Sequence, residues 1–591
     1  MLLSGVLLVI LSVAGRLSDH PLIWSQEATQ LGVLILAFLG GAVAYRDGQL
    51  PALGLLSGRL SPKWRVLHAA LLEWMVLLIS GVIAASSTSL IGQGANQLSP
   101  ALQIPLAWFS FPVFGGFALM LIFAAHRLAT HKWSIVGISG GVAVAIGAGI
   151  WLSYPFWAQL DAEQQLVGVV VVATVLLLLD QSLVFVLIGA ATFYCFASNT
   201  PIFAIPQSLE NGFDSFLLLA IPFFVLAGFL MANGGISSRI VDLVLALLQR
   251  VRGGLFHAVI VTMYIFSGIS GSHTADLVAV GSAMTDEIRM RRYNTAEGTA
   301  VLAASAAMGL TIPPSIALLV IGSVTGVSVA ALFAGGLIPA AVLAVALFVV
   351  VSLRADAKPA VRQAVRITWR RTAILGFRAV PPLLMPVILI AGIIGGIATP
   401  TEVSSFAVAY GFILLVGYRS LSWSDLWQTM RRATSLIGMV LLLLAGANAL
   451  AWFLTASNTI QTLVQTLGDL PGGKVTFLFV SIALIVITAA LFEGLPAILV
   501  LAPVLIPAAQ SQDINLIQYS IILVLGQGIG FYSPPIGVGF FIASKVIQSN
   551  LIQAMRHSIP YVVALLVGLV IVALVPWLTL VLPQLLGIRS T

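Results

Sequence analysis

The feature that most constrains the fold of this chain is a series of long apolar runs spread over its whole length. Clear examples span residues 67–88, 106–125, 330–353, 435–454 and 561–582. Each is long enough for a helix that crosses a bilayer, which needs about 20 residues. The runs are continuously apolar and do not alternate, so they predict helices rather than the strands of a β-barrel. We therefore predict an all-α polytopic membrane protein with about fourteen crossings and two shorter paired segments.

The composition excludes an ordinary soluble protein. Hydrophobic residues make up 60% of the chain and charged residues only 8%, whereas soluble chains carry about 25% charged residues. A surface so poor in charge must face a lipid bilayer. The net charge of +7 is expected to mark cytoplasmic loops, and we expect no nucleic-acid partner. The single cysteine, Cys195, rules out an internal disulfide and a thiolate metal site.

The basic residues indicate an orientation. If residues 46–65 are cytoplasmic and the chain changes side at each apolar run, all but three of the 27 Lys and Arg residues fall on the cytoplasmic side. The exceptions are Arg16, Lys474 and Arg589. The positive-inside rule predicts this bias. The N-terminus is then cytoplasmic and the C-terminus periplasmic, and we expect residues 1–14 to remain as a first helix rather than to be removed as a signal peptide.

The chain also contains an internal repeat, over about residues 213–352 and 435–583. One register with small insertions aligns Phe229 with Phe453, Gly271 with Gly494, Pro313 and Pro314 with Pro534 and Pro535, and Pro339 with Pro560. Under the orientation above, the first copy begins on an inward helix and the second on an outward helix. The repeats are therefore predicted to be inverted, as in many secondary transporters. The alternative is two unrelated helical stretches that share prolines by chance.

Each copy has two places where a membrane helix cannot continue smoothly. The first is a predicted re-entrant hairpin, at residues 255–289 from the cytoplasm and at residues 475–509 from outside. The second is a broken helix, at residues 309–315 and 530–535, where paired prolines remove backbone donors and expose carbonyl groups. The simpler interpretation is that each proline pair only kinks a packed helix.

Exposed carbonyls can hold a dehydrated cation, and the starts of half-helices can hold an anion. We predict two Na⁺ sites, one per hairpin tip and adjacent broken helix. Their residues are Ser270, Gly271, Gly309 and Thr311 in the first site and Glu493, Gly494, Gly530 and Ser533 in the second, with Pro313, Pro314, Pro534 and Pro535 as the structural breaks.

The predicted substrate-binding residues lie beside the first hairpin tip and the first break: Ser272, His273, Asp276 and Ser315. Ionisable residues within the apolar zone are candidates for function. His273 could respond to protons or act only as a hydrogen-bonded polar group. Glu402 has two possible roles. It could belong to the transport machinery or its scaffold, or its carboxylate could only stabilise the N-terminus of a helix.

Several motifs, in order along the chain, resemble the large membrane subunit of tripartite ATP-independent periplasmic (TRAP) transporters. They are residues 220–228 (AIPFFVLAG), Met231 with residues 234–236 (GGI), and residues 267–272 (SGISGS), 312–316 (IPPSI), 399–402 (TPTE) and 533–537 (SPPIG). Residues 24–27 (WSQE) and 99–102 (SPAL) resemble motifs of the family's small four-helix subunit. This resemblance divides the chain into a small-subunit-like domain at 1–132, a fusion helix and linker at 133–164, and a large-subunit-like domain at 165–591.

The resemblance implies an elevator mechanism, in which a transport domain with both hairpins slides against a scaffold. It also implies sodium-coupled symport of an organic acid, such as a dicarboxylate or sialic acid, across the bacterial inner membrane, with delivery by a periplasmic substrate-binding protein. Two positions depart from the family pattern. Glu493 stands where an aspartate is more common, and His273 stands where a small residue is more common, which leaves the ion site and a proton role open.

Two other functions fit parts of the sequence. An ion-coupled anion carrier would need the same breaks but no binding protein. An intramembrane serine protease would use residues 268–271 (GISG), with His257, His273 or His557 as the base. The second hairpin has no serine at its tip, at residues 492–494 (FEG), which argues against the protease. We therefore predict a transporter and not an enzyme.

Overall fold

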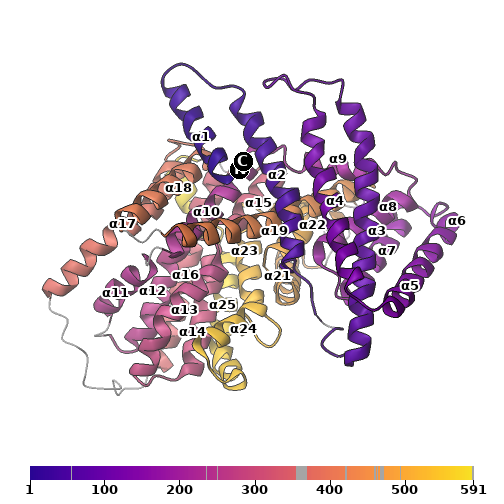
Figure 1. Cartoon of the computed structure of the whole chain (residues 1–591). Coiled ribbons are helices and arrows are strands. Elements are labelled where there is room, and N and C mark those ends of the chain that lie inside the picture. Colours follow the sequence, from indigo (N-terminus) through magenta and orange to yellow (C-terminus); the bar gives the residue numbers. More distant parts are fainter. Residues whose placement is uncertain are drawn as a thin grey trace. The chain divides into compact units, whose positions relative to one another are not determined.

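The computed structural model describes residues 1–54, 56–233, 236–248, 251–354, 369–418, 422–457, 461, 464–465, 471–492 and 494–588. Its named elements in these ranges are helices (Figure 1). Eleven of them are long and apolar enough to cross a membrane, which confirms the predicted all-helical, polytopic class. The number is below the expected fourteen or so. Several apolar helices are too short to be included in this number, both beside the breaks, as Ile316–Thr325 and Val538–Ile547, and away from them, as Leu2–Leu17 and Leu183–Ala197.

The chain forms two compact units. Unit 1 consists of Met1–Leu219 and Arg431–Leu463, and unit 2 consists of Ala220–Met430 and Val464–Thr591. The helices of unit 1 are α1 (Leu2–Leu17), α2 (Ser25–Arg46), α3 (Pro62–Gly94), α4 (Ala107–Ala129), α5 (Trp133–Leu152), α6 (Tyr154–Trp157), α7 (Ala162–Leu178), α8 (Leu183–Ala197), α9 (Ala204–Asn211), the 3₁₀ helix η1 (Phe216–Leu219) and most of α19 (Trp423–Ala456).

Unit 2 contains both predicted hairpins and both predicted breaks. Its helices are α10 (Ala220–Asn233), α11 (Ile236–Leu248), α12 (Gly254–Ser270), α13 (His273–Met290), α14 (Thr295–Gly309), α15 (Ile316–Thr325), α16 (Val329–Arg354), α17 (Trp369–Ile394), α18 (Pro400–Gly417), α21 (Gly473–Leu491), α22 (Gly494–Ser511), α23 (Leu516–Phe531), α24 (Val538–Ile547), α25 (Leu551–Leu574) and α26 (Trp577–Leu585).

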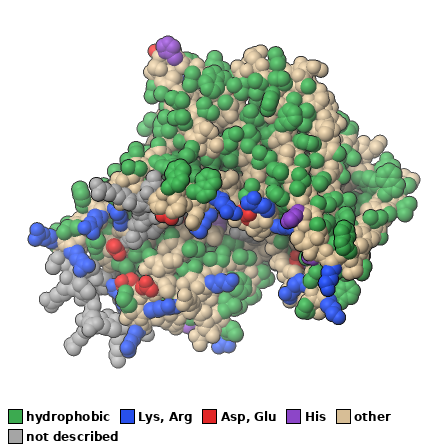
Figure 2. Space-filling view, viewed as in Figure 1, with side chains coloured by type: hydrophobic (Ala, Val, Ile, Leu, Met, Phe, Trp, Pro, Cys, Tyr) green, Lys and Arg blue, Asp and Glu red, His purple; other side chains and the backbone are tan. Residues whose placement is uncertain are grey.

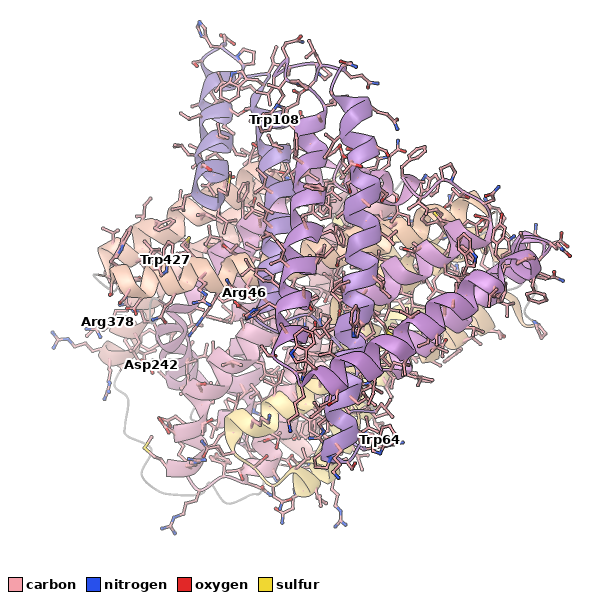
Figure 3. All side chains as sticks on the ribbon, turned by 45° about the vertical axis from the view of Figure 1, so that its right-hand side comes forward. Arg46, Trp64, Trp108, Asp242, Arg378 and Trp427 are labelled. Carbon is pink, nitrogen blue, oxygen red and sulfur yellow. The ribbon has the colours of Figure 1, made fainter. Side chains whose placement is uncertain are left out.

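The surface of the protein is apolar. Figure 2 shows hydrophobic side chains over much of the visible face. In unit 1, Trp64 at the start of α3 and Trp108 at the start of α4 are 63% and 54% exposed. The two tryptophans lie at opposite ends of the bundle (Figure 3). Tryptophans gather at the two membrane–water interfaces, so this arrangement fits a bundle that spans a bilayer along the α3 axis.

The first helices of unit 1 are tied by a carboxylate. Glu27, in the first turn of α2, accepts hydrogen bonds from the backbone N–H groups of Ala101 and Leu102 at 2.9 and 2.8 Å. The bond brings together residues 24–27 and 99–102, the two motifs of the small-subunit resemblance. The loop before α4 is thereby fixed to the start of α2.

Unit 1 also contains a close crossing between α2 and α19. A Cβ at Gly438 would lie 2.1 Å from the carbonyl carbon of Gly40, so only glycine permits this approach. The Ser435 hydroxyl donates to Oε1 of Gln49 at 2.8 Å beside the crossing. Small residues allow membrane helices to pack at short distance, and here they join the N-terminal bundle to a helix almost 400 residues later.

A second carboxylate of unit 1 lies on α9. Ser110 of α4 donates to Oε2 of Glu210 at 2.7 Å, and Gln30 of α2 donates to Asp214 at 3.2 Å. Burial raises the pKa of Glu210 to about 7; the Ser110 hydrogen bond opposes this rise and the charge of Asp214 adds to it. The side chain is therefore held close to its titration point at neutral pH.

Unit 2 repeats one order of helices. The series α12, α13, α14, α15 and α16 has 17, 18, 15, 10 and 26 residues, and the series α21 to α25 has 19, 18, 16, 10 and 24. In each series the third and fourth helices are separated by a pair of prolines. Both Pro–Pro peptide bonds are cis.

One carboxylate connects the two series within unit 2. Glu297, in the first turn of α14, is 8% exposed. It accepts from Nε and Nη2 of Arg354, at the end of α16, at 2.8 and 2.9 Å. His557 and Tyr561 of α25 also contact its carboxylate. Three helices are thus held by a single buried charge.

Candidate functional site

The first hairpin tip rests against the first helix break. α12 ends at Gly271, whose φ of +64° lies in the left-handed region that favours glycine. A Cβ at Gly271 would lie 3.1 Å from the carbonyl oxygen of Pro314, and a Cβ at Gly309 would lie 2.2 Å from Oγ of Ser267. Glycine at both positions therefore lets the hairpin backbone approach the broken helix closely.

The first break itself lies between Gly309 and Ile316. Thr311 is fully buried there, and its hydroxyl donates to the carbonyl of Met308 at 3.2 Å. Ser315 caps α15 by accepting from the N–H of Leu318 at 3.3 Å. This segment thus places the Thr311 hydroxyl, the backbone carbonyls of the break and the N-terminus of α15 side by side.

The second break has the same relation to the second hairpin. A Cβ at Gly530 would lie 2.3 Å from the carbonyl oxygen of Val486 on α21. Ser533 lies in the turn after α23, where its hydroxyl donates to the carbonyl of Ile529. Pro534 and Pro535 lie between Phe531, the last residue of α23, and Val538, the first of α24. Here too a hairpin helix packs directly on a helix that is about to break.

The two hairpin tips meet each other. A Cβ at Gly494, the first residue of α22, would lie 3.4 Å from Nε2 of His273, the first residue of α13, and 2.8 Å from Nε2 of Gln527 on α23. The His273 ring also packs edge-on against Phe531 at 5.5 Å. The starts of α13 and α22 and the end of α23 therefore converge at one place.

The two broken helices cross beside this place. A Cβ at Gly528 of α23 would lie 2.3 Å from the carbonyl oxygen of Ala307 on α14. The breaks that follow Gly309 and Phe531 are thus brought together from segments more than 200 residues apart. The arrangement offers oxygen atoms suited to a hard cation such as Na⁺ and helix N-termini suited to an anion.

The other predicted residues lie at or near this centre, with one exception. Asp276 is 1% exposed in the first turn of α13, and Ser272 precedes that helix. Glu402 is part of α18 and forms a capping box with Thr399, whose N–H it accepts at 3.1 Å. The structural role that the sequence allowed for Glu402 is thus present, and a transport role stays a prediction.

Two predicted ligands, Glu493 and the side chain of Ser270, lie outside the described residues. Within the described ranges, no group of three or more His, Cys, Asp or Glu side chains is placed to hold a metal ion.

Sequence reasoning missed two polar residues of this centre, Ser267 and Gln527. Each is buried in a largely apolar helix. A polar side chain within a membrane helix was the available signal, but neither side chain is ionisable, and ionisable residues are the clearer indication of function in a membrane.

Two of the three candidate protease bases, His257 and His557, are engaged away from the hairpin tip. Nε2 of His257 lies 3.1 Å from Oγ of Ser352 and 3.3 Å from the carbonyl of Phe348. His557 contacts Glu297. Both rings thus serve as structural contacts of unit 2, in keeping with a transporter.

Comparison with known proteins gives the family. The model of the DctM component of the tripartite ATP-independent periplasmic transporters matches residues 169–578, and that of the DctQ component matches residues 5–131. The isethionate TRAP transporter permease DctMQ of Oleidesulfovibrio alaskensis is 29% identical over 569 residues, covering 94% of this chain and 87% of that one. The C4-dicarboxylate TRAP transporter large permease DctM of Pseudomonas aeruginosa is 32% identical over 402 residues, covering 68% and 93%.

Among solved structures, the YdaH transporter of Alcanivorax borkumensis aligns with a TM-score of 0.45 at 16% identity, over 63% of this chain and 87% of that one. The two family models together cover most of the chain, in the order small component then large component. The chain is therefore a transporter and not an enzyme. It belongs to the TRAP transporter family, as a multi-pass permease of the bacterial inner membrane in which the DctQ and DctM components are joined in one polypeptide.

Proposed function

We propose that this permease imports an organic acid by sodium-coupled symport, with the substrate delivered by a periplasmic binding protein. The observation that supports this most is the meeting of both hairpin tips with both helix breaks in unit 2. Membrane-embedded backbone that leaves the helical ladder is tolerated where it lines a polar site. Carbonyl oxygens for a cation and helix N-termini for an anion then lie within one small region.

The coupling ion would be held by the oxygen atoms of the two breaks. The first site would use Ser270, Thr311 and the carbonyl groups near Gly271 and Gly309. The second would use Glu493, Ser533 and the carbonyl groups near Gly494 and Gly530. Hard oxygen donors of this kind suit Na⁺. The bound ion would supply positive charge that offsets the carboxylate of the substrate.

The repeated helix series supports an elevator mechanism. In this proposal the series α12 to α16 and α21 to α25 are inverted copies, and each contributes one re-entrant hairpin to a moving transport domain. The N-terminus is cytoplasmic and the C-terminus periplasmic. Residues 1–132 and the fusion helix within residues 133–164 belong to the scaffold, and the moving elements come from residues 165–591.

The test is uptake by the full chain reconstituted in proteoliposomes. The radiolabelled probes are isethionate, succinate and sialic acid, each offered with and without the cognate binding protein. We expect uptake only with an inward sodium gradient and only with the binding protein. Equal uptake under a potassium or proton gradient alone would reject sodium coupling. Uptake that needs no binding protein would instead identify a carrier that takes its anion directly.

The first ion site has its own test. Thr311→Val keeps the shape of the side chain but removes its hydroxyl oxygen. We expect the sodium concentration for half-maximal uptake to rise several-fold, with less change at saturating sodium. The matched control is Ser305→Ala on α14, because the Ser305 hydroxyl is also buried and also bonds a helix carbonyl, that of Val301 at 2.7 Å. An equal response of the two variants would place sodium elsewhere.

A further inference from the structure

The amide of Gln527 is buried and has no hydrogen-bond partner among the residues that the structure describes. The side chain is 0% exposed on α23, and among the described residues neither its Oε1 nor its Nε2 finds a donor or acceptor. Native proteins pair nearly all buried polar groups, because an unpaired one loses its bonds to water without compensation. An amide left in this state therefore calls for a functional explanation.

The position of the Gln527 amide indicates its function. Gln527 lies where both hairpin tips meet, since a Cβ at Gly494 would lie 2.8 Å from its Nε2 and 3.4 Å from Nε2 of His273. The backbone on either side is held tightly. Gly528 packs against the carbonyl of Ala307, and a Cβ at Gly526 would lie 3.0 Å from Ile485. The amide is therefore fixed at the centre of the predicted transport site rather than at a free helix surface.

A second buried glutamine on the same helix shows the ordinary structural use of this side chain. Gln518 is 1% exposed, and its Nε2 donates to the carbonyl of Ala573 on α25 at 2.7 Å, so that among the described residues only its Oε1 is left unpaired. It joins two helices by a bond from side chain to backbone. Gln527 makes no such bond within the described residues, so helix packing does not account for it.

We propose that Gln527 determines substrate specificity by hydrogen-bonding a hydroxylated organic anion, accepting from its hydroxyl group through Oε1 and donating to its anionic oxygen through Nε2. Both halves of the amide are unpaired, so a ligand that satisfies them must present a donor and an acceptor close together. An organic acid with a hydroxyl group near its carboxylate or sulfonate meets this requirement. The helix N-termini at His273 and Gly494 favour the anionic end. The inference rests on the proposed import of an organic acid and specifies its class.

The test compares two pairs of acids that differ in one hydroxyl group, L-malate with succinate and isethionate with ethanesulfonate. Binding to the detergent-purified full chain is measured for each acid. We expect the hydroxylated member of at least one pair to bind about tenfold more tightly, because a site built to bond a hydroxyl group rejects an analogue that lacks it. Gln527→Leu should abolish that preference and leave thermal stability unchanged or slightly higher.

Gln518→Leu is the matched control. It should lower thermal stability, because it breaks the bond to Ala573, and it should keep the preference for the hydroxylated acid. If Gln527→Leu does not fold, Gln527→Met removes the same polar atoms from an unbranched side chain and should give the same loss of preference. A wild type without preference in either pair overturns the proposal, as does a Gln527 variant that retains it. Sodium-driven import of unhydroxylated acids would still leave the proposed function standing.

Discussion

The carboxylate of Glu297 is predicted to be a principal stabilising contact of unit 2. It receives two hydrogen bonds from Arg354 and contacts from His557 and Tyr561. Glu297→Gln keeps the size of the side chain but removes its charge. The new NH₂ group must then face an N–H of the Arg354 guanidinium, because Arg354 donates to both carboxylate oxygens. A buried acceptor is thereby replaced with a group that repels its neighbours.

The magnitude follows from the burial of the two partners. Breaking a fully buried ion pair costs about 3–5 kcal/mol. The Glu297 side chain is 10% exposed but that of Arg354 is 36% exposed, so water replaces part of the lost interaction and we expect about 2 kcal/mol. For a chain of this length, 1 kcal/mol corresponds to roughly 0.8 °C in Tm. The variant should therefore unfold about 2 °C below wild type.

The assay is thermal unfolding of the detergent-purified full chain, followed by tryptophan fluorescence at one fixed heating rate. Glu287→Gln is the control, because Glu287 of α13 pairs at 2.7 Å with Arg291, four residues later, and both side chains are partly open to solvent. Such a pair contributes only about 0.3–0.5 kcal/mol. If Glu297→Gln lowers Tm no more than Glu287→Gln does, the carboxylate does not hold the three helices together.

Two further predictions concern unit 1. Burial raises the pKa of Glu210 from its ordinary value of 4.5 to about 7. Between these two pH values the folded protein keeps a proton that the unfolded chain has released, so the free energy of unfolding should fall as pH rises from 4.5 to 7. The fall is at most about 3 kcal/mol, and roughly half that for a partly exposed group. Glu210→Gln should flatten this dependence of Tm on pH, and parallel curves for the two proteins would contradict it. Gly438→Ala should sharply reduce the yield of folded protein on size-exclusion chromatography, because the new Cβ would lie 2.1 Å from the Gly40 backbone. The control is Gly446→Ala on the same helix, whose Cβ would have its nearest contact at 3.5 Å and should leave the yield unchanged.

The class of the protein could be read from the sequence because lipid imposes a simple rule. A segment without water must satisfy its own backbone, so long apolar runs can only be helices here. The same rule located the interruptions. Paired prolines cannot continue a helical ladder, and the helices do end at Gly309 and Phe531, with new ones starting at Ile316 and Val538.

The number of crossings was harder to predict. A hydropathy run shows how much apolar sequence is present, but not where one helix stops and its continuation begins. The segments around both breaks read as full crossings, whereas α15 and α24 are each only 10 residues long. Turns and prolines divide one apolar run into two helices, and the hydropathy of the run does not show the division.

The sequence by itself determined the membrane class, the helical character of the chain and the positions where the helices break, because these depend on local chemistry and on lipid as solvent. Only the tertiary structure decided which helices meet. It brought His273 to Gly494 and Gln527, and it joined Glu297 to Tyr561, 264 residues away. Apolar periodicity gives no partner for a helix in lipid, where association depends on close packing of small residues and on particular hydrogen bonds. Such contacts exist only once the chain is folded.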